Sequence, residues 1–253
     1  MRIIELDKSY SEKKGDFYDI KGKRLGIIGL FIGLITLLVI FLFLKYNQVL
    51  AKHSIWFLIL IIILAILSTR FIKKSEFYFF KRDIADKGTI GEKRIIQVLN
   101  ESNFSDDYIA IKNYKIPETR IGDIDILLIG PKGIFILESK NYRGVFRVSE
   151  TDVYKKLKFR KSYRLLDKEI IKQIKQQKEL LEKFLERANI KIPIYPFLVF
   201  TSNYAIIERI IGHPGVFVCN YKDLPQKIFS IERLNFYNDN LKAQILLALG
   251  IKE

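Results

Sequence analysis

Three charged residues in the middle of the chain, Asp125, Glu138 and Lys140, have the types and spacing of a site that hydrolyses phosphodiesters. Two carboxylates can hold Mg²⁺ or Mn²⁺ while water and phosphate oxygens complete the coordination shell. The cation activates water, and a neighbouring ammonium orients that water or stabilises the charge of the transition state. The alternative is a structural salt bridge, because an aspartate followed at some distance by Glu-x-Lys is a loose pattern.

The sequence around these residues predicts a β-hairpin. The apolar run over 124–129 suits a buried strand, residues 130–133 (Gly-Pro-Lys-Gly) suit a turn, and residues 134–138 suit the returning strand. Side chains alternate along a strand, so Glu138 and Lys140 share a face, and the turn brings Asp125 towards Glu138. Buried charges are costly unless they are paired or bound to a metal. The hairpin is therefore expected to gather two carboxylates and one ammonium at its open end.

Other elements are expected on both sides of this hairpin. Apolar periodicity predicts helices over residues 88–100, 167–188 and 241–249. Short runs rich in β-branched and aromatic residues predict strands over 107–112, 145–148, 153–159, 195–201 and 215–219. A helix, several strands, a second helix and further strands indicate an α/β fold, with a mixed central sheet flanked by helices.

The hairpin and the helix start before it resemble the nuclease-related domain (NERD) family, which is placed within the PD-(D/E)XK nuclease-like superfamily. The resemblance covers roughly residues 88–221. It is carried by Ile-Asp-Ile at 124–126, by Gly88-x-x-Gly91-Glu92 and, most specifically, by GIFILESKNYRG at 133–144. It implies a restriction-endonuclease-like core.

The resemblance also implies roles for individual residues. Asp125 and Glu138 match metal-binding carboxylates, Lys140 matches the catalytic lysine, and Glu92 matches a Gly-Glu pair that completes the acidic site. Mg²⁺ or Mn²⁺ is the implied cofactor, and DNA or RNA is the implied substrate. Asp123, two residues before Asp125, is either a second metal ligand or an exposed acid at the strand end, and we favour the second interpretation.

The later helix departs from the family pattern. Gln173 fits the family glutamine, but Ile174 replaces the asparagine beside it, and Glu169-Ile170 replace Asn-Pro. Gln177 stands where a histidine is common. These departures weaken a catalytic role for Gln173 more than they weaken the roles of the Asp–Glu–Lys set.

Two apolar runs before this domain predict a membrane anchor. Residues 25–44 carry no charge, and at about 1.5 Å per residue they span about 30 Å, the thickness of a hydrocarbon core. The second run, over 54–72, is interrupted only by Arg70, which can snorkel to the interface. Residues 45–53 suffice only to turn the chain back. We therefore expect a transmembrane α-helical hairpin, followed by a polar linker over 73–87 and the domain over 88–253.

Two other interpretations of these runs are less favoured. A cleaved signal peptide would need a small-residue cleavage site after the first run, and the sequence there is Lys45-Tyr46-Asn47. A buried helical hairpin of a soluble protein would have an apolar stripe, whereas both runs are apolar all round.

Lys and Arg gather at the outer ends of the two runs, which predicts the orientation. The flanking cations are Arg2, Lys8, Lys13, Lys14, Lys21, Lys23 and Arg24 before the first run, and Arg70, Lys73, Lys74, Lys81 and Arg82 in and after the second. Between the runs lie only Lys45 and Lys52. The positive-inside rule then puts residues 1–24 and the domain in the cytoplasm. We expect a multi-pass protein with two spans, both termini cytoplasmic, in a bacterial plasma membrane.

A basic stretch after the hairpin interleaves cations with aromatic residues. The cations Lys155, Lys156, Lys158, Arg160 and Lys161 can follow a phosphate backbone, while the rings of Tyr154, Phe159 and Tyr163 stack on unpaired bases. One alternative is an amphipathic strand whose rings enter the core and whose lysines face water. Another is contact with anionic lipid beside the anchor.

Composition narrows the function further. Lys and Arg outnumber Asp and Glu by 43 to 28, a balance that favours polyanionic partners or reflects a solvated basic surface. The single cysteine, Cys219, excludes an intramolecular disulfide and a multi-cysteine metal site. His53 and His213 show no ligand or triad spacing. The sequence thus predicts a membrane-anchored, Mg²⁺-dependent nuclease, the alternative being a non-catalytic scaffold that binds nucleic acid or the membrane surface.

Overall fold

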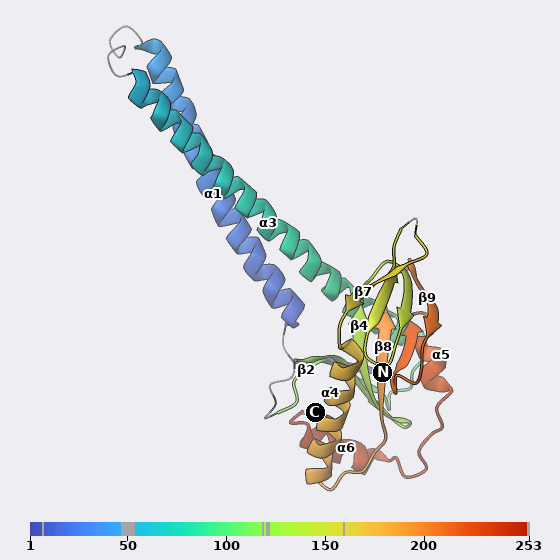
Figure 1. Cartoon of the computed structure of the whole chain (residues 1–253). Helices are drawn as coiled ribbons and strands as arrows, with labels where there is room; N and C mark the ends of the chain where they lie inside the picture. The colour runs from blue at the N-terminus through green and yellow to red at the C-terminus, as the bar shows by residue number, and fades with distance from the viewer. Residues whose placement is uncertain (7, 47–53, 118, 120–121, 159, 252–253) are drawn as a thin grey trace. The chain divides into compact units, whose positions relative to one another are not determined.

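The computed structural model describes the chain except for residues 7, 47–53, 118, 120–121, 159 and 252–253 (Figure 1). The expected turn between the two apolar runs and the end of the strand expected over 153–159 fall on those positions. The chain divides into two compact units. One is Ser11–Asp86, and the other combines Met1–Tyr10 with Lys87–Glu253.

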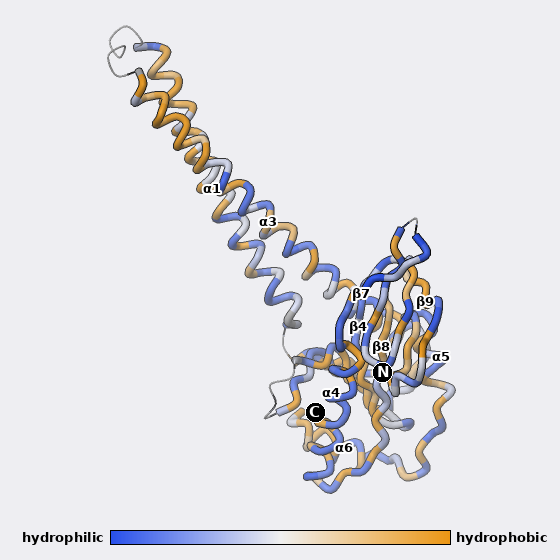
Figure 2. Tube along the Cα trace, viewed as in Figure 1, coloured by the Kyte–Doolittle hydropathy of each residue, from blue (hydrophilic) through white to orange (hydrophobic). Residues whose placement is uncertain are grey.

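The first unit is a pair of long helices. Helix α1 spans Tyr10–Lys45, and helix α3 spans Ser54–Glu101 and contributes its first two thirds to this unit. Both helices are long and apolar enough to cross a membrane, as the sequence predicts for 25–44 and 54–72. Figure 2 shows that the C-terminal part of α1 and the N-terminal part of α3 are apolar, whereas the other ends carry polar residues.

The segment expected to be a linker, residues 73–87, is helical. Helix α3 runs through it without a break, so the prediction of a new helix starting at Gly88 is wrong. The stretch contains no proline to stop the helix, and a glycine inside a helix costs only about 1 kcal/mol relative to alanine.

Small residues line the contact between α1 and α3. Gly22, Gly26, Gly29 and Gly33 recur at helical spacing and face Phe79, Ser75, Ile72 and Ser68 respectively. A Cβ on Gly29 would lie 2.9 Å from Cγ1 of Ile72. The hydroxyls of Ser68 and Ser75 donate hydrogen bonds of 2.8 Å to the carbonyls of Gly29 and Gly22. Close approach and interhelical hydrogen bonds replace the hydrophobic effect where lipid surrounds a helix pair.

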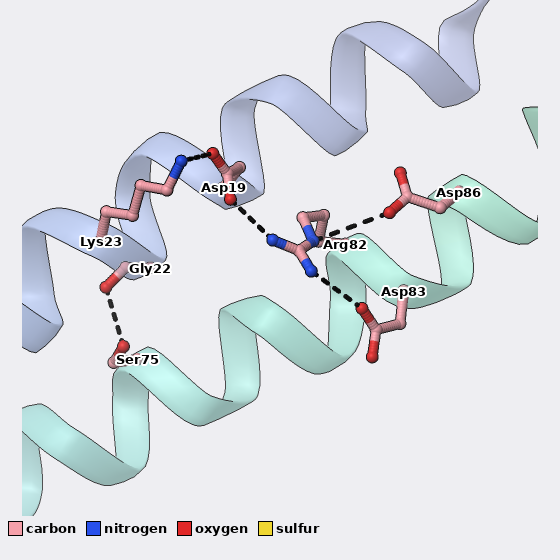
Figure 3. A network of polar contacts seen from close by, with 7 residues as sticks. All are labelled: Asp19, Gly22, Lys23, Ser75, Arg82, Asp83 and Asp86. Atoms are coloured by element: carbon pink, nitrogen blue, oxygen red, sulfur yellow. Dashed lines mark hydrogen bonds and ion pairs between the residues drawn. The ribbon is translucent and has the colours of Figure 1, made fainter.

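A polar network joins the same helices outside the apolar part (Figure 3). The Asp19 carboxylate lies 2.5 Å from Nζ of Lys23 and accepts a 2.8 Å hydrogen bond from Nη1 of Arg82. These two cations lower the pKa of Asp19, Lys23 more than Arg82. Arg82 also pairs with Asp83 and Asp86 on its own helix, at 3.4 and 3.6 Å. The network thus links the two helices through charged side chains outside their apolar parts.

The second unit contains two β-sheets, as the fold class predicted from the sequence requires. The six-stranded sheet has the order β1-β2-β3-β4-β8-β10, and the four-stranded sheet has the order β7-β6-β5-β9. In chain order the strands are β1 (Arg2–Glu5), β2 (Ile109–Tyr114), β3 (Ile124–Gly130), β4 (Gly133–Lys140), β5 (Gly144–Val148), β6 (Val153–Lys156), β7 (Tyr163–Asp167), β8 (Ile194–Phe200), β9 (Ala205–Ile210) and β10 (Phe217–Asn220). Helices α4 (Ile170–Arg187), α5 (Leu224–Phe229) and α6 (Asp239–Ala248) complete it.

The six-stranded sheet is apolar on both faces because both are covered. Side chains such as Leu127 and Ile129 pack on one face with α4, α6 and the four-stranded sheet. Ile126 and Leu128 pack on the other face with the end of α3 and with α5. This double burial explains why the strands read as continuous apolar runs rather than alternating ones.

The structure also differs from the expected elements elsewhere. Strand β1, which lies before the first apolar helix, pairs in parallel with β2, and its four residues carry too weak a pattern to be found. Strands β7 and β9 were also missed. The helix expected from Asp167 begins at Ile170, because residues 163–167 pair with β6 instead. The expected hairpin across residues 150–152 is present as β5–β6.

Candidate active site

The β3–β4 hairpin brings the three chemistry-bearing residues together. The strands are antiparallel, and the pair Ile126–Leu137 sets Asp125 opposite Glu138. One carboxylate oxygen of Asp125 accepts a 2.8 Å hydrogen bond from the backbone N–H of Ser139. Nζ of Lys140 lies 3.0 Å from a carboxylate oxygen of Glu138, which is 5% exposed. The turn and register predicted from the sequence therefore produce the expected cluster.

Helix α3 adds Glu92 to this cluster, and Gly91 is what allows it. A Cβ on Gly91 would lie 2.5 Å from Oγ of Ser139 and 2.7 Å from Oγ1 of Thr201, so only glycine fits between the helix and the ends of β4 and β8. Asn141 also holds the helix, through a 2.9 Å hydrogen bond to the carbonyl of Lys87. Glu92 is 4% exposed and is close enough for its charge to act on Asp125.

The cluster holds more acidic than basic side chains. Burial raises the pKa of Asp125 well above its usual range, and the charges of Glu138 and Glu92 raise it further, against Lys140 and the Ser139 N–H. Burial disfavours the charged form of Lys140, but the carboxylates of Glu138 and Asp125 outweigh it and raise the pKa of the ammonium. With all three carboxyl groups ionised, the cluster would hold three negative charges against one ammonium, and a bound divalent cation would offset that repulsion.

The donor set fits a hard cation held by few protein ligands. Among the residues that the structure describes, no group of three or more His, Cys, Asp or Glu side chains is arranged to hold a metal. Asp125 and Glu138, opposite each other at the end of the hairpin, are the carboxylates that would hold Mg²⁺ or Mn²⁺, and oxygens from water and substrate would complete the shell. Mg²⁺ is commonly bound in this way, by one or two carboxylates plus phosphate oxygens.

Tyr142 and Asp167, which lie next to Lys140 in the structure, were not identified from the sequence. The Tyr142 hydroxyl donates a 2.7 Å hydrogen bond to Asp167, and the same carboxylate oxygen lies 4.0 Å from Nζ of Lys140. Burial and the bond to Asp167 raise the pKa of Tyr142, although Lys140 opposes this. Asp167 reads as a helix start in the sequence, so only the pairing of β7 with β6 reveals that it faces the site.

In α4 the buried glutamine is Gln177, whereas the resemblance to the family assigned a catalytic role to Gln173. Gln177 is fully buried and donates a hydrogen bond of 3.4 Å to the carbonyl of Asp123, just before β3. The Gln173 side chain is partly exposed and makes no hydrogen bond with another described residue. The contact between α4 and the strand that carries Asp125 thus comes from Gln177, one turn later. Asp123 lies outside β3 and is partly exposed.

Residues 87–201 match the family model described as nuclease-related domain, NERD. The match includes Glu92, Asp125, Glu138 and Lys140, as well as Tyr142 and Asp167. The chain contains a nuclease-related domain. No curated protein and no solved structure matches the chain. The resemblance read from the sequence is confirmed over the part of the chain that carries the acidic cluster.

The cations predicted to bind nucleic acid lie on both faces and at the tip of the two-stranded ribbon β6–β7. Lys156 lies 3.3 Å from Glu208, on the face where Tyr163 also bonds to Glu208 and lies under Arg147. Lys155 is paired with Phe146 and so points to the opposite, inner face. The remaining cations, Lys158, Arg160 and Lys161, lie exposed at the tip of the ribbon.

Because Gly91 sets the approach of α3, we expect Gly91→Ala to move Glu92 away from Asp125. The added methyl must displace the hydroxyls of Ser139 and Thr201, and overpacking of this kind costs about 1–3 kcal/mol. Thermal unfolding of the purified full-length protein in detergent would measure the loss. Gly122→Ala is the matched control, since a Cβ there meets nothing within 4 Å. Equal unfolding temperatures for the two variants would contradict the tight approach.

Proposed function

We propose that this protein is a membrane-anchored nuclease that uses Mg²⁺ or Mn²⁺ to hydrolyse phosphodiester bonds in DNA or RNA. The observation that carries the proposal is the convergence of Asp125, Glu138 and Lys140 at the end of β3–β4, inside a nuclease-related domain. Two carboxylates with excess negative charge suit a divalent cation, and the ammonium beside them suits a phosphate.

In this proposal each side chain has a defined task. Asp125 and Glu138 hold the divalent cation, which when bound supplies a Lewis acid that lowers the pKa of water and offsets charge on phosphorus. The Ser139 N–H orients the carboxylate of Asp125. The carboxylates of Glu138 and Asp125 raise the pKa of Lys140. In this proposal its ammonium is the positive charge beside the scissile phosphate.

Asp167 and Tyr142 support this arrangement from the second sheet. The Asp167 carboxylate lies between the Tyr142 hydroxyl and the Lys140 ammonium. It limits the positions that the flexible lysine side chain takes up, which keeps the ammonium pointed at one place. Glu92 adds negative charge next to Asp125 and so strengthens the attraction for a cation.

We expect the full-length protein in detergent to cut labelled DNA or RNA when Mg²⁺ or Mn²⁺ is present, and to stop when EDTA is added. Lys140→Ala should lower the rate by about a hundredfold or more, as when one transition-state partner is removed. Asp125→Asn should abolish cutting through loss of cation binding. Lys191→Ala, which removes an exposed lysine just before β8, is the control and should cut normally. Binding without cutting in both metals would refute catalysis and leave a nucleic-acid-binding scaffold.

The cations of the β6–β7 ribbon should differ in their effect on binding. Lys155 on the inner face, and Lys158, Arg160 and Lys161 at the tip, are proposed to contact phosphates. Replacing Lys155 with Ala should weaken binding for all sequences and reduce the salt slope by about 1. Lys156→Ala should change binding little, because Glu208 already offsets its charge. Fluorescence anisotropy over a salt series measures both variants, and a larger effect of Lys156→Ala would contradict the assignment.

We further propose that both ends of the helical hairpin face the cytoplasm. Strand β1 precedes α1, and its partner β2 follows α3, so a sheet that contains both needs its strands on one side of the membrane. This supports an even number of spans. The excess of Lys and Arg at the outer ends of the hairpin supports the cytoplasmic side.

Cysteine labelling in intact cells tests this orientation. A membrane-impermeant maleimide should label Lys45→Cys from outside. Ile3→Cys and Arg160→Cys should react only after the cells are opened. The native Cys219 is buried and serves as the unreactive background. Labelling of Ile3→Cys in intact cells would overturn the proposed orientation.

A further inference from the structure

A second group of side chains lies beside the acidic cluster, at the carboxyl ends of the parallel strands β4, β8 and β10. Such edges commonly hold ligands in α/β sheets. The loops after these strands contact one another through their backbones. Thr201 N–H bonds to the carbonyl of Lys140 at 3.1 Å, Gly144 N–H to that of Tyr204 at 2.9 Å, and Tyr221 N–H to that of Phe200 at 3.0 Å.

These loops carry aromatic rings next to cations. The guanidinium of Arg143 lies 5.4 Å from the ring centre of Tyr204, and Nζ of Lys222 lies 5.9 Å from that of Tyr221. The Tyr221 hydroxyl donates a 2.6 Å hydrogen bond to Asn203, which connects the two loops. We call Arg143, Tyr204, Tyr221 and Lys222 the aromatic edge.

Tyr204 is the residue that most needs an explanation. Its side chain is 68% exposed, although it follows a buried strand and precedes the buried Ala205. Tyr163, considered from the sequence as a stacking ring, is in a different situation from Tyr204. Its ring lies 4.0 Å under Arg147 and its hydroxyl is bonded to Glu208, so it is already used within the fold.

An exposed ring with a guanidinium beside it matches the chemistry of an unpaired nucleotide. The base stacks on the ring, and the cation attracts the phosphate. In a duplex the bases are stacked on their neighbours and present only their edges, so an aromatic platform cannot reach their faces. The backbone link from Lys140 to Thr201 puts the loop of Tyr204 next to the residues proposed to act on a phosphodiester.

We infer that the aromatic edge binds unpaired nucleotides, so that the site takes single-stranded nucleic acid. The inference deepens the proposed function and rests on it for the position of the scissile phosphate. Tyr204 supplies the stacking ring, and Arg143 supplies the charge next to it. Tyr221, held by Asn203, supports the neighbouring loop.

Binding measurements on the full-length protein in detergent test the inference. With EDTA present to prevent cutting, fluorescence anisotropy compares a single-stranded oligonucleotide with the duplex of the same sequence. Tyr204→Ala should weaken single-strand binding by about fivefold to a hundredfold, the effect of losing one stacked base. Duplex binding should change less than about twofold. Tyr204→Phe should bind like the native protein, because stacking needs the ring and not the hydroxyl.

A matched control comes from the opposite end of the strands, away from the aromatic edge. Phe236 is 53% exposed and lies near the β3–β4 turn, where Leu234 N–H bonds to the Pro131 carbonyl. Phe236→Ala removes an exposed ring of similar size and should leave single-strand binding unchanged. A 2-aminopurine base in the oligonucleotide should lose fluorescence on binding to the native protein and keep it with Tyr204→Ala.

The outcomes separate this inference from the proposed function. Loss of single-strand binding in Tyr204→Ala, without cutting by the native protein in any metal, would support the aromatic edge and refute catalysis. Cutting that Tyr204→Ala leaves unchanged, with unchanged single-strand binding, would refute the aromatic edge and support catalysis. Equal losses for single strand and duplex would also overturn the inference. Absence of any nucleic-acid binding by the native protein would overturn both.

Discussion

The acidic cluster depends on one electrostatic balance, in which Lys140 offsets carboxylates that the fold brings out of water. Asp125, Glu138 and Glu92 come from three different elements, and their mutual repulsion would push those elements apart. Close packing has to resist that repulsion. The β3–β4 hairpin, which is apolar apart from its open end, supplies the rigid base, and the glycine at position 91 lets the helix come near enough. Asp167, from the smaller sheet, restrains the lysine from the other side.

The core of the site could be predicted from the sequence because its signals are local. The turn over residues 130–133 and the alternation of side chains along the strand are both set within a few residues. They fix the register of β3 against β4. Asp167 could not be found, because its place depends on β7 pairing with β6, and β7 is short and largely exposed. The continuous α3 was missed for a related reason. Its middle is stabilised by contacts with α1 more than by its own composition.

The two sheets carry different groups of charged and aromatic residues. The larger sheet carries the charged cluster and the aromatic edge at the ends of neighbouring strands, which are held in fixed order by their hydrogen bonds. The smaller sheet presents a basic ribbon whose outer face is engaged by Glu208. A cation is therefore not equivalent to every other cation in this basic chain. The face of the strand on which a cation lies decides whether it pairs with Glu208 or points away from it.

The pairing of strand β1 with β2 constrains the order in which the parts of the chain can fold. Strand β2 begins more than a hundred residues after β1 in the chain, and such distant pairings form late because a long loop must close first. On a ribosome, both apolar helices emerge before β2 does. In the proposed membrane-anchored protein, insertion into the bilayer would therefore precede completion of the larger sheet. Until β1 pairs with β2, the edge of that sheet at β2 is uncovered, a state prone to aggregation.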